Sequence, residues 1–570
     1  MKGSMYVKGL LIRGVILVST ILMFGLNHLS IWHLVLIIGF IAVTKDVEIR
    51  FNRKDLGWMV CFILLNVFSF YMNPPKQLGY EMVLAVLRAD FYFSLFKIIT
   101  ALTAKNMLYH TERMLSKWQK TQFLIMMVLV LLIFYFPLLL AFSPGNMYID
   151  SYSQWGQAMG GIPLSDWHPV LTTLLMKLSY KLIGTPVVYT LMQVVGSIMV
   201  LTYFSKQLLD LRLKKSYILL VVFTILFTTL LLSNMVTLYK DNLYNLSLVL
   251  VTLFLVRIYF IEPTWLQHWS SKIIFAFNFN VVLLGRHNGF YVGIAFLVIW
   301  LFFSFDKWKD VAIIIVLTAL IFMGYHTLLN QRYAIIPGSP SEKYSMVLQH
   351  IGAVVDAGRP LTEEQNEFLD QILPRATWQE KYTPVMIDPV KFHQDFNKEF
   401  INTHQKELLK NWLTIGQQYP LLYLRAELQQ IRPLWDVNGW EHGLPGTQMF
   451  HYMINSPKAY YDPYLQHYDF AVDSLRNLIA ELSYQQAPHD GVHKPFITSV
   501  ASVSILVLFA CSFSVIFAKR WTYLLILLPS LLHLGTLCLA MPAYNIRYIL
   551  APVITSMMLA IIFKVVSTKY

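Results

Sequence analysis

The chain has 570 residues, of which 56% are hydrophobic and only 14% are charged, and its mean hydropathy is +0.52. Soluble proteins average about 25% charged residues, so this composition excludes an ordinary soluble protein. The net charge of +13 does not indicate nucleic-acid binding, because the sequence contains no phosphate-binding loop and no basic tract interleaved with aromatic residues. The three cysteines, Cys61, Cys511 and Cys538, each lie in an apolar run, which argues against a disulfide framework and a Cys-based zinc site.

Apolar runs of about 17 to 25 residues match the length of a helix that crosses a bilayer. Such runs occur along most of the chain, and no signal-peptide cleavage site precedes the end of the first one. The sequence therefore predicts an all-α polytopic membrane protein, with a bundle of about fourteen transmembrane helices. The predicted spans are 11–27, 31–44, 56–72, 81–104, 121–142, 186–204, 217–233, 243–260, 273–284, 290–305, 311–329, 496–518, 522–541 and 549–566.

The distribution of Lys and Arg predicts the orientation, because these residues collect in short loops on the cytoplasmic side. With both termini in the cytoplasm, most basic residues fall inside. The short outer loops then hold only Lys76, Lys240, Arg286 and Arg547. The apolar segment 168–184 would move the basic loop 206–215 to the outside if it crossed the membrane. We therefore expect it to form an interfacial or re-entrant helix on the outer face.

The pattern divides the chain into four parts, which are 1–120, 121–329, 330–495 and 496–570. The first and last hold transmembrane helices, and the second is a transmembrane core with a catalytic outer loop at 143–185. The third part is the only long polar stretch, so we expect a mainly helical extracytoplasmic domain. Within it, 362–372 and 395–415 have apolar residues at helical spacing, and Thr362 with Gln365 forms a capping-box pattern.

The stretch 143–169 lies between two apolar segments and contains no Lys or Arg. Its ionisable residues are Asp150, Asp166 and His168, which we take as candidate catalytic residues because ionisable groups beside a bilayer are costly and mark function. Each has a structural alternative. Asp150 and Asp166 could cap the helices that follow them, and His168 could orient a neighbouring side chain.

Three more clusters on the predicted outer side could bind phosphate. They are Lys240 and Asp241 in LYKDN, Arg286, His287 and Asn288 in GRHNG, and Arg547 and Tyr548 in NIRY. Arg binds phosphate through two parallel hydrogen bonds and Lys binds it as a point charge. We expect these clusters to meet the 143–169 loop in one pocket that opens to lipid. In the alternative reading, Lys240 and Asp241 pair with each other and Arg547 is an interfacial anchor.

This set of residues suits transfer from a lipid phosphate. A carboxylate can take the proton of an attacking hydroxyl, or can hold a divalent metal such as Mg²⁺ or Mn²⁺. Asp150 and Asp166 are the candidate ligands if a metal is used. Four tryptophans of the polar domain could stack on a sugar or could pack in its core: Trp378, Trp412, Trp435 and Trp440.

The motifs IDSYSQWGQAMGG, SDWHPVLTTLL, LYKDNLY, GRHNG, LQHIGAVVDAGRPLTEEQ and NIRY resemble those of an uncharacterised family of large membrane proteins of Gram-positive bacteria, usually grouped with the GT-C class of glycosyltransferases. The resemblance covers most of the chain after about residue 121. It implies a polyprenyl-phosphate sugar donor and a catalytic or metal-binding acid in the first large outer loop, a position that Asp150 fits. Ser151 and Tyr152 follow Asp150, so the paired acids of many GT-C members are absent here.

The resulting hypothesis is a glycosyltransferase of the bacterial cell membrane, with its active site on the extracytoplasmic face. It would move a sugar from a polyprenyl-phosphate donor to a glycan or wall-polymer acceptor, with membrane lipid as a further partner and no nucleic acid. The alternatives are a transporter or flippase of a lipid-linked sugar, and a non-enzymatic scaffold in wall assembly.

Overall fold

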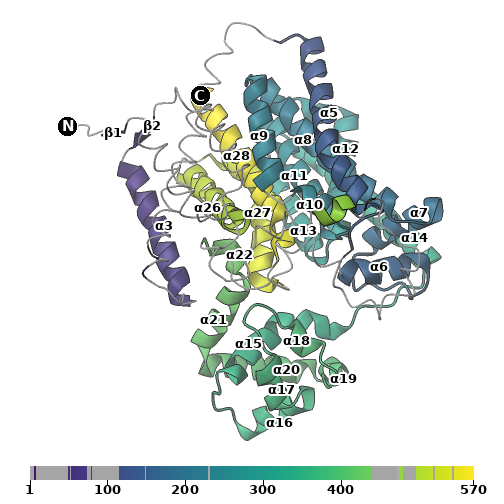
Figure 1. The fold of residues 1–570 in the computed structure, drawn as a ribbon, viewed down its shortest axis with the longest axis vertical. Helices are drawn as coiled ribbons and strands as arrows, with labels where there is room; N and C mark the ends of the chain where they lie inside the picture. The colour runs from purple at the N-terminus through teal and green to yellow at the C-terminus, as the bar shows by residue number, and fades with distance from the viewer. Residues whose placement is uncertain are drawn as a thin grey trace.

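The structure is a computed structural model, and it describes residues 5–7, 49–51, 53–72, 115–147, 149–228, 231–437, 474–478, 496–517, 520–541 and 545–569, with isolated positions at 79, 82 and 472. The regular elements of this part of the chain are helices, apart from two antiparallel three-residue strands, β1 (Met5–Val7) and β2 (Ile49–Phe51). The helices form a bundle, and a smaller domain lies beyond one of its ends (Figure 1).

Five helices among the described residues are long and apolar enough to cross a membrane. They are α5 (Lys117–Phe142), α8 (Val187–Asp210), α11 (Asp241–Val256) continued by the π-helical turn η2 (Arg257–Ile261), α14 (Trp308–Arg332) and α27 (Trp521–Ala540). Shorter apolar stretches occur in α3 (Arg53–Met72), α9 (Lys215–Thr228), α12 (Trp269–Gly285), α13 (His287–Phe303), α26 (Phe496–Phe517) and α28 (Leu550–Lys569).

These helices account for most of the predicted spans, although the count of fourteen remains a prediction. The predicted spans 11–27 and 31–44 and nearly all of 81–104 lie outside the described residues. The predicted span 217–233 falls on α9 and on α10 (Leu231–Met235), and residues 229–230 lie outside the described residues.

The bundle has one large apolar core, to which α5, α8, α9, α11, α12, α13, α27 and α28 all contribute. Some polar side chains inside it pair with one another across helices. Tyr135 and Ser197, for example, share a hydrogen bond of 2.7 Å between α5 and α8. At the start of α5, Ser116 and Gln119 form a reciprocal capping box, which fixes where this span begins.

The loop predicted at 143–185 contains two helices, α6 (Ile149–Met159) and α7 (Val170–Ile183). They pack against each other and against the start of α8 around a small separate core that includes Trp155 and Tyr189. Both lie at the end of the bundle nearer the smaller domain (Figure 1). Neither is among the candidate spans, and the interfacial placement of α7 remains a prediction.

The smaller domain is helical, as predicted, and has its own core. Its elements are η4 (Pro340–Tyr344), α15 (Ser345–Asp356), α16 (Glu363–Ile372), α17 (Arg375–Lys381), α18 (Asp388–Lys391), α19 (Lys398–Thr403), α20 (Gln405–Gln418) and α21 (Pro420–Gln430). The predicted capping box of Thr362 and Gln365 is confirmed at the start of α16. The chain then returns through α22 (Arg432–Trp435), which packs on α26 in the bundle.

Candidate functional site

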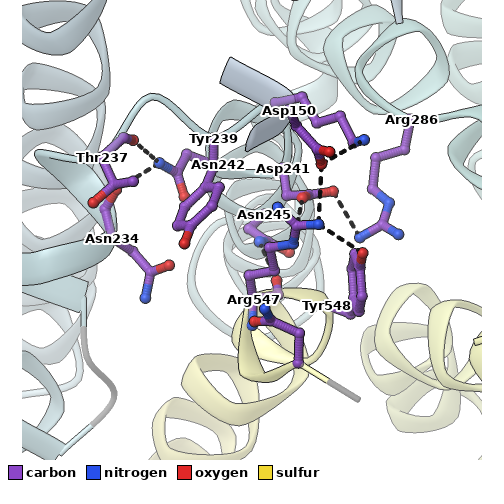
Figure 2. A network of polar contacts seen from close by, with 12 residues as sticks. Asp150, Asn234, Thr237, Tyr239, Asp241, Asn242, Asn245, Arg286, Arg547 and Tyr548 are labelled. Carbon is purple, nitrogen blue, oxygen red and sulfur yellow. Dashed lines mark hydrogen bonds and ion pairs between the residues drawn. The ribbon is translucent and has the colours of Figure 1, made fainter. Parts of the chain in front are cut away.

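The candidate site lies where several helices begin at the bundle end nearer the smaller domain (Figure 1). Asp150 is in the first turn of α6, Lys240 immediately precedes α11, and Asp241 is the first residue of α11. Arg286 is the only residue between α12 and α13. Arg547 lies in the short turn η6 (Ile546–Tyr548), just before α28. Figure 2 shows Asp150, Asp241, Arg286 and Arg547 pointing toward one another.

A short parallel pairing of backbone segments brings Asp150 to Lys240. The backbone N–H of Asn146 donates to the carbonyl of Val236, and that of Leu238 donates to the carbonyl of Asn146, both at 2.8 Å. Gly145 has a φ of +146°, and a Cβ there would lie 2.4 Å from Oγ1 of Thr190. Glycine is therefore required for the loop to approach α8 this closely.

Asp150 is held by two cations through one oxygen. Its Oδ2 accepts from Nζ of Lys240 and from Nη2 of Arg547, each at 3.0 Å. Its Oδ1 has no hydrogen bond among the described residues, and 24% of the side chain is exposed. Burial would raise the pKa of Asp150, but Lys240 and Arg547 outweigh it and hold the pKa well below its usual range. One carboxylate oxygen is therefore anchored while the other remains accessible.

Asp241 is completely buried and forms the second anchor of the cluster. Its Oδ1 lies 2.9 Å from Nη1 of Arg286, and its Oδ2 lies 3.5 Å from Nε of Arg547. Arg547 therefore connects both carboxylates, and its Nη2 also donates to the hydroxyl of Tyr548 at 2.8 Å. The ring centroid of Tyr548 lies 4.8 Å from the guanidinium carbon of Arg286 and 4.9 Å from that of Arg547. The ring of Tyr548 thus lies within cation–π distance of both guanidinium groups and stabilises them.

The cluster contains three cationic and two anionic side chains, so the five together carry a net charge of +1. His168 does not add to it. Burial, and then Lys240, lower the pKa of His168 to about 3, so the ring is neutral at physiological pH. Its Nδ1 lies 2.9 Å from Nζ of Lys240. Because an ammonium can only donate, Nδ1 accepts and the ring proton is on Nε2.

Several buried polar residues that were not among the predicted site residues hold this arrangement. Asn245 donates to the backbone carbonyl of Arg547 at 2.9 Å. His533 contacts the carbonyl of Tyr548 at 2.7 Å through Nε2, and the hydroxyl of Tyr244 at 2.9 Å through Nδ1. The signal in the sequence is a polar residue inside an apolar run, and such residues occur throughout α11 and α27.

The structure places the other predicted site residues at the edge of the cluster or outside it. Asn288 supports Arg286, because its Oδ1 accepts from Nε of Arg286 at 3.0 Å. His287 is exposed and contacts the carbonyl of Trp167 at 3.2 Å instead of the cluster. Asp166 is also exposed, and its backbone N–H donates to Ile336 at 2.9 Å. Among the described residues, its side chain makes no ion pair with Lys240, Arg286 or Arg547.

Two structural alternatives are excluded by these contacts. Lys240 does not pair with its neighbour Asp241, since the two residues have different partners. Asp166 does not cap α7, because the N-cap of that helix is Pro169 and no side chain caps it.

The residues at Asp150 do not fit a divalent metal. Lys240 and Arg547 both lie against the same carboxylate oxygen and would repel a second cation. Across the described part of the chain, no three His, Cys, Asp or Glu side chains are grouped as ligands. We therefore assign no step of the reaction to Mg²⁺ or Mn²⁺ held between Asp150 and Asp166.

Comparison with known proteins connects the chain to a family. A model described as a family of unknown function (DUF6020) matches residues 160–569. The matched region includes His168, Lys240, Asp241, Arg286 and Arg547, and Asp150 lies ten residues before it. No curated protein and no solved structure matches the chain.

Proposed function

We propose that this chain, which belongs to the DUF6020 family of unknown function, is a membrane glycosyltransferase of the GT-C type. It moves a sugar from a polyprenyl-phosphate carrier to an acceptor hydroxyl. The reaction takes place on the extracytoplasmic face of a bacterial cell membrane, where the acceptor is a glycan or wall polymer. Both termini then lie in the cytoplasm, and the helical domain at 340–430 lies outside with the site.

The observation that carries this proposal is the partly exposed carboxylate of Asp150 within a cluster of five charged side chains whose net charge is positive. A phosphodiester has one negative charge, which would balance the +1 of the five charged side chains. The cluster lies at helix ends, where a phosphate can stay at the interface while its hydrocarbon chain remains in lipid. A transporter would be expected to bind nearer the midplane, so this position favours transfer over transport.

Phosphate binding and base formation are coupled in this arrangement. A donor phosphate would compete with Oδ2 of Asp150 for Nζ of Lys240 and Nη2 of Arg547. Each contact that moves to the phosphate removes a contact that lowers the pKa of Asp150. The carboxylate is thus a weak base in the free protein and a stronger base once the donor is bound. Proton transfer to Asp150 is therefore disfavoured until the donor is bound.

The step then balances as a displacement at the anomeric carbon. The acceptor oxygen forms a bond to that carbon while the bond between the carbon and the phosphate oxygen breaks. The hydroxyl proton moves to Asp150, and the electron pair leaves with the polyprenyl phosphate. Arg286, Arg547 and Lys240 stabilise the departing anion, so no general acid is required. His168 holds Lys240 in position through Nδ1.

The test begins with mass spectrometry of lipid-linked sugars and wall polymers from cells with and without the protein, which identifies donor and acceptor. Transfer is then measured with Asp150→Asn, which keeps the shape and removes the charge. We expect transfer to fall by at least about a hundredfold, as for loss of a general base.

Asp210→Asn is the matched control. Asp210 also pairs with a lysine and an arginine, Lys120 at 2.7 Å and Arg257 at 3.9 Å. It is the last residue of α8, about 36 Å along that helix from the end near the site. Transfer should be retained in this variant. Undiminished transfer by a folded Asp150→Asn protein would remove the assignment.

A further inference from the structure

Two exposed aromatic rings face each other beside the candidate site, one from each part of the molecule. Trp167 belongs to the loop before α7, and Phe392 follows α18 in the helical domain. Their ring centroids are 6.0 Å apart and their planes differ by only 13°. Nevertheless, 40% of Trp167 and 54% of Phe392 remain exposed. Exposed large apolar side chains that cluster in this way mark binding surfaces more often than isolated ones do.

The pair is tied directly to the residues of the cluster. Trp167 immediately precedes His168, whose Nδ1 contacts Lys240, which in turn contacts Asp150. The carbonyl of Trp167 also contacts His287 at 3.2 Å. Any group that lies against the Trp167 ring is therefore only a few side chains from the accessible oxygen of Asp150.

The helical domain adds a carboxylate next to the rings. The backbone N–H of Phe392 donates to the carbonyl of Asp388 at 2.9 Å, so these two residues lie one helical turn apart. Asp388 is 42% exposed at its side chain. Burial raises the pKa of Asp388 and Lys391 opposes this, while Glu342 and Asp150 raise the pKa further and Arg547 lowers it. The turn that presents Phe392 to Trp167 thus also holds Asp388 near the cluster.

A cation completes the surface. Nζ of Lys398 lies 5.8 Å from the ring centroid of Trp167 and 5.1 Å from that of Phe392. Aromatic rings bind the apolar C–H faces of a pyranose, while carboxylate and ammonium groups bind its hydroxyls. Flat apolar contact with a few polar groups around it is the usual chemistry of such a site.

The tryptophans that the sequence suggested for sugar stacking do not provide this surface. Trp378 is fully buried in the core of the helical domain. Trp412 is half-buried, with its ring stacked on His350 and its Nε1 donating to Nδ1 of the same residue. Trp435 packs on Phe68, and its Nε1 donates to the carbonyl of Leu428. Trp440 lies outside the described residues.

From these contacts we infer that Trp167, Phe392, Asp388 and Lys398 form an acceptor subsite that binds a pyranose ring of a glycan chain. This inference rests on the proposed function, because the acceptor hydroxyl must be near Asp150. It names the acceptor as a preformed oligosaccharide instead of a small alcohol, and it gives the helical domain a role in binding that acceptor.

Binding can be measured without any transfer reaction. The purified full-length protein in lipid nanodiscs is titrated calorimetrically with chitotetraose, cellotetraose and maltotetraose. We expect at least one of these to bind the wild-type protein. Phe392→Ala and Trp167→Ala should each weaken this binding by tenfold or more, while Trp167→Phe should lose less because it keeps a ring.

The matched control is Phe305→Ala. Phe305 is 83% exposed and follows α13 at the far end of that helix, about 25 Å from the end near the site. Its removal should leave oligosaccharide binding unchanged.

The acceptor subsite and the catalytic role of Asp150 can be refuted independently of each other. If no tetrasaccharide binds, or if Phe392→Ala and Trp167→Ala bind as tightly as the wild type, the acceptor subsite is overturned whatever Asp150 does. If Asp150→Asn transfers sugar normally while the aromatic variants lose binding, the catalytic proposal fails and a glycan-binding surface remains.

Discussion

Asp241 offers the most direct test of the charge balance in the cluster. It is completely buried, and its two oxygens face Arg286 at 2.9 Å and Arg547 at 3.5 Å. Asp241→Asn keeps the volume of the side chain but raises the net charge of the five side chains from +1 to +2. Breaking a buried ion pair from one side costs about 3–5 kcal/mol, because the partner charge stays buried and uncompensated. We expect the variant to be destabilised by an amount of this order.

The assay is the thermal midpoint of the purified protein in detergent, with and without inorganic pyrophosphate. The wild type should gain some stability from the anion, since a ligand that binds only the folded state stabilises it. Asp241→Asn should gain more, because its cluster has a larger positive charge. The difference between the two gains measures whether the cations attract an anion.

Asp210→Asn again serves as the control. Arg257 keeps Glu262 as a partner when Asp210 is neutralised, so the free energy of unfolding should fall by no more than about 1 kcal/mol. Pyrophosphate should stabilise this variant by the same amount as the wild type. The charge-balance reasoning is refuted if Asp241→Asn is as stable as the wild type. It is equally refuted if pyrophosphate stabilises the two proteins by the same amount.

Two further outcomes are expected from the geometry. His168 has a pKa of about 3 in the folded protein and about 6.5 when unfolded, so the unfolded state binds more protons between these values and stability falls as the pH is lowered. Between pH 7 and pH 5 denaturant titration should show a loss of about 2 kcal/mol in the wild type that His168→Gln lacks, and equal losses would contradict the assignment. In Gly289→Ala the new Cβ would lie 2.2 Å from the carbonyl oxygen of Val282, which should lower the thermal midpoint by the equivalent of about 1–3 kcal/mol. Gly324→Ala, with no atom within 4 Å, should not, and a Gly289→Ala protein as stable as this control would count against the close packing.

The convergence of Asp150, Lys240 and Arg547 was predictable from the sequence because each lies in a loop on the predicted outer side of the membrane. Once the basic loops fix an orientation, residues at alternate loops must share one side of the membrane. The pairing of individual side chains was not predictable. Lys240 and Asp241 are neighbours in the chain, but the start of α11 directs them to different partners.

The position of Asp166, which was not predictable, depends on a long-range backbone contact. Asp166 looked equivalent to Asp150 because both are acids in one loop. The pairing of its backbone with Ile336, far along the chain, leaves its side chain exposed. Composition and periodicity carry no information about such pairing.

The junction between α12 and α13 limits where an epitope tag can be inserted into this protein. Arg286 alone joins the two helices, in an extended conformation with φ −149° and ψ 147°. One inserted amino acid would turn the first residues of α13 by about 100° around the helix axis and withdraw the guanidinium from Asp241. The connection from Ser304 to Lys307 is longer than a single residue and contributes no side chain to the ion-pair cluster. Epitope insertions should therefore be tolerated there and rejected at Arg286, so the length of this connection is itself a determinant of the site.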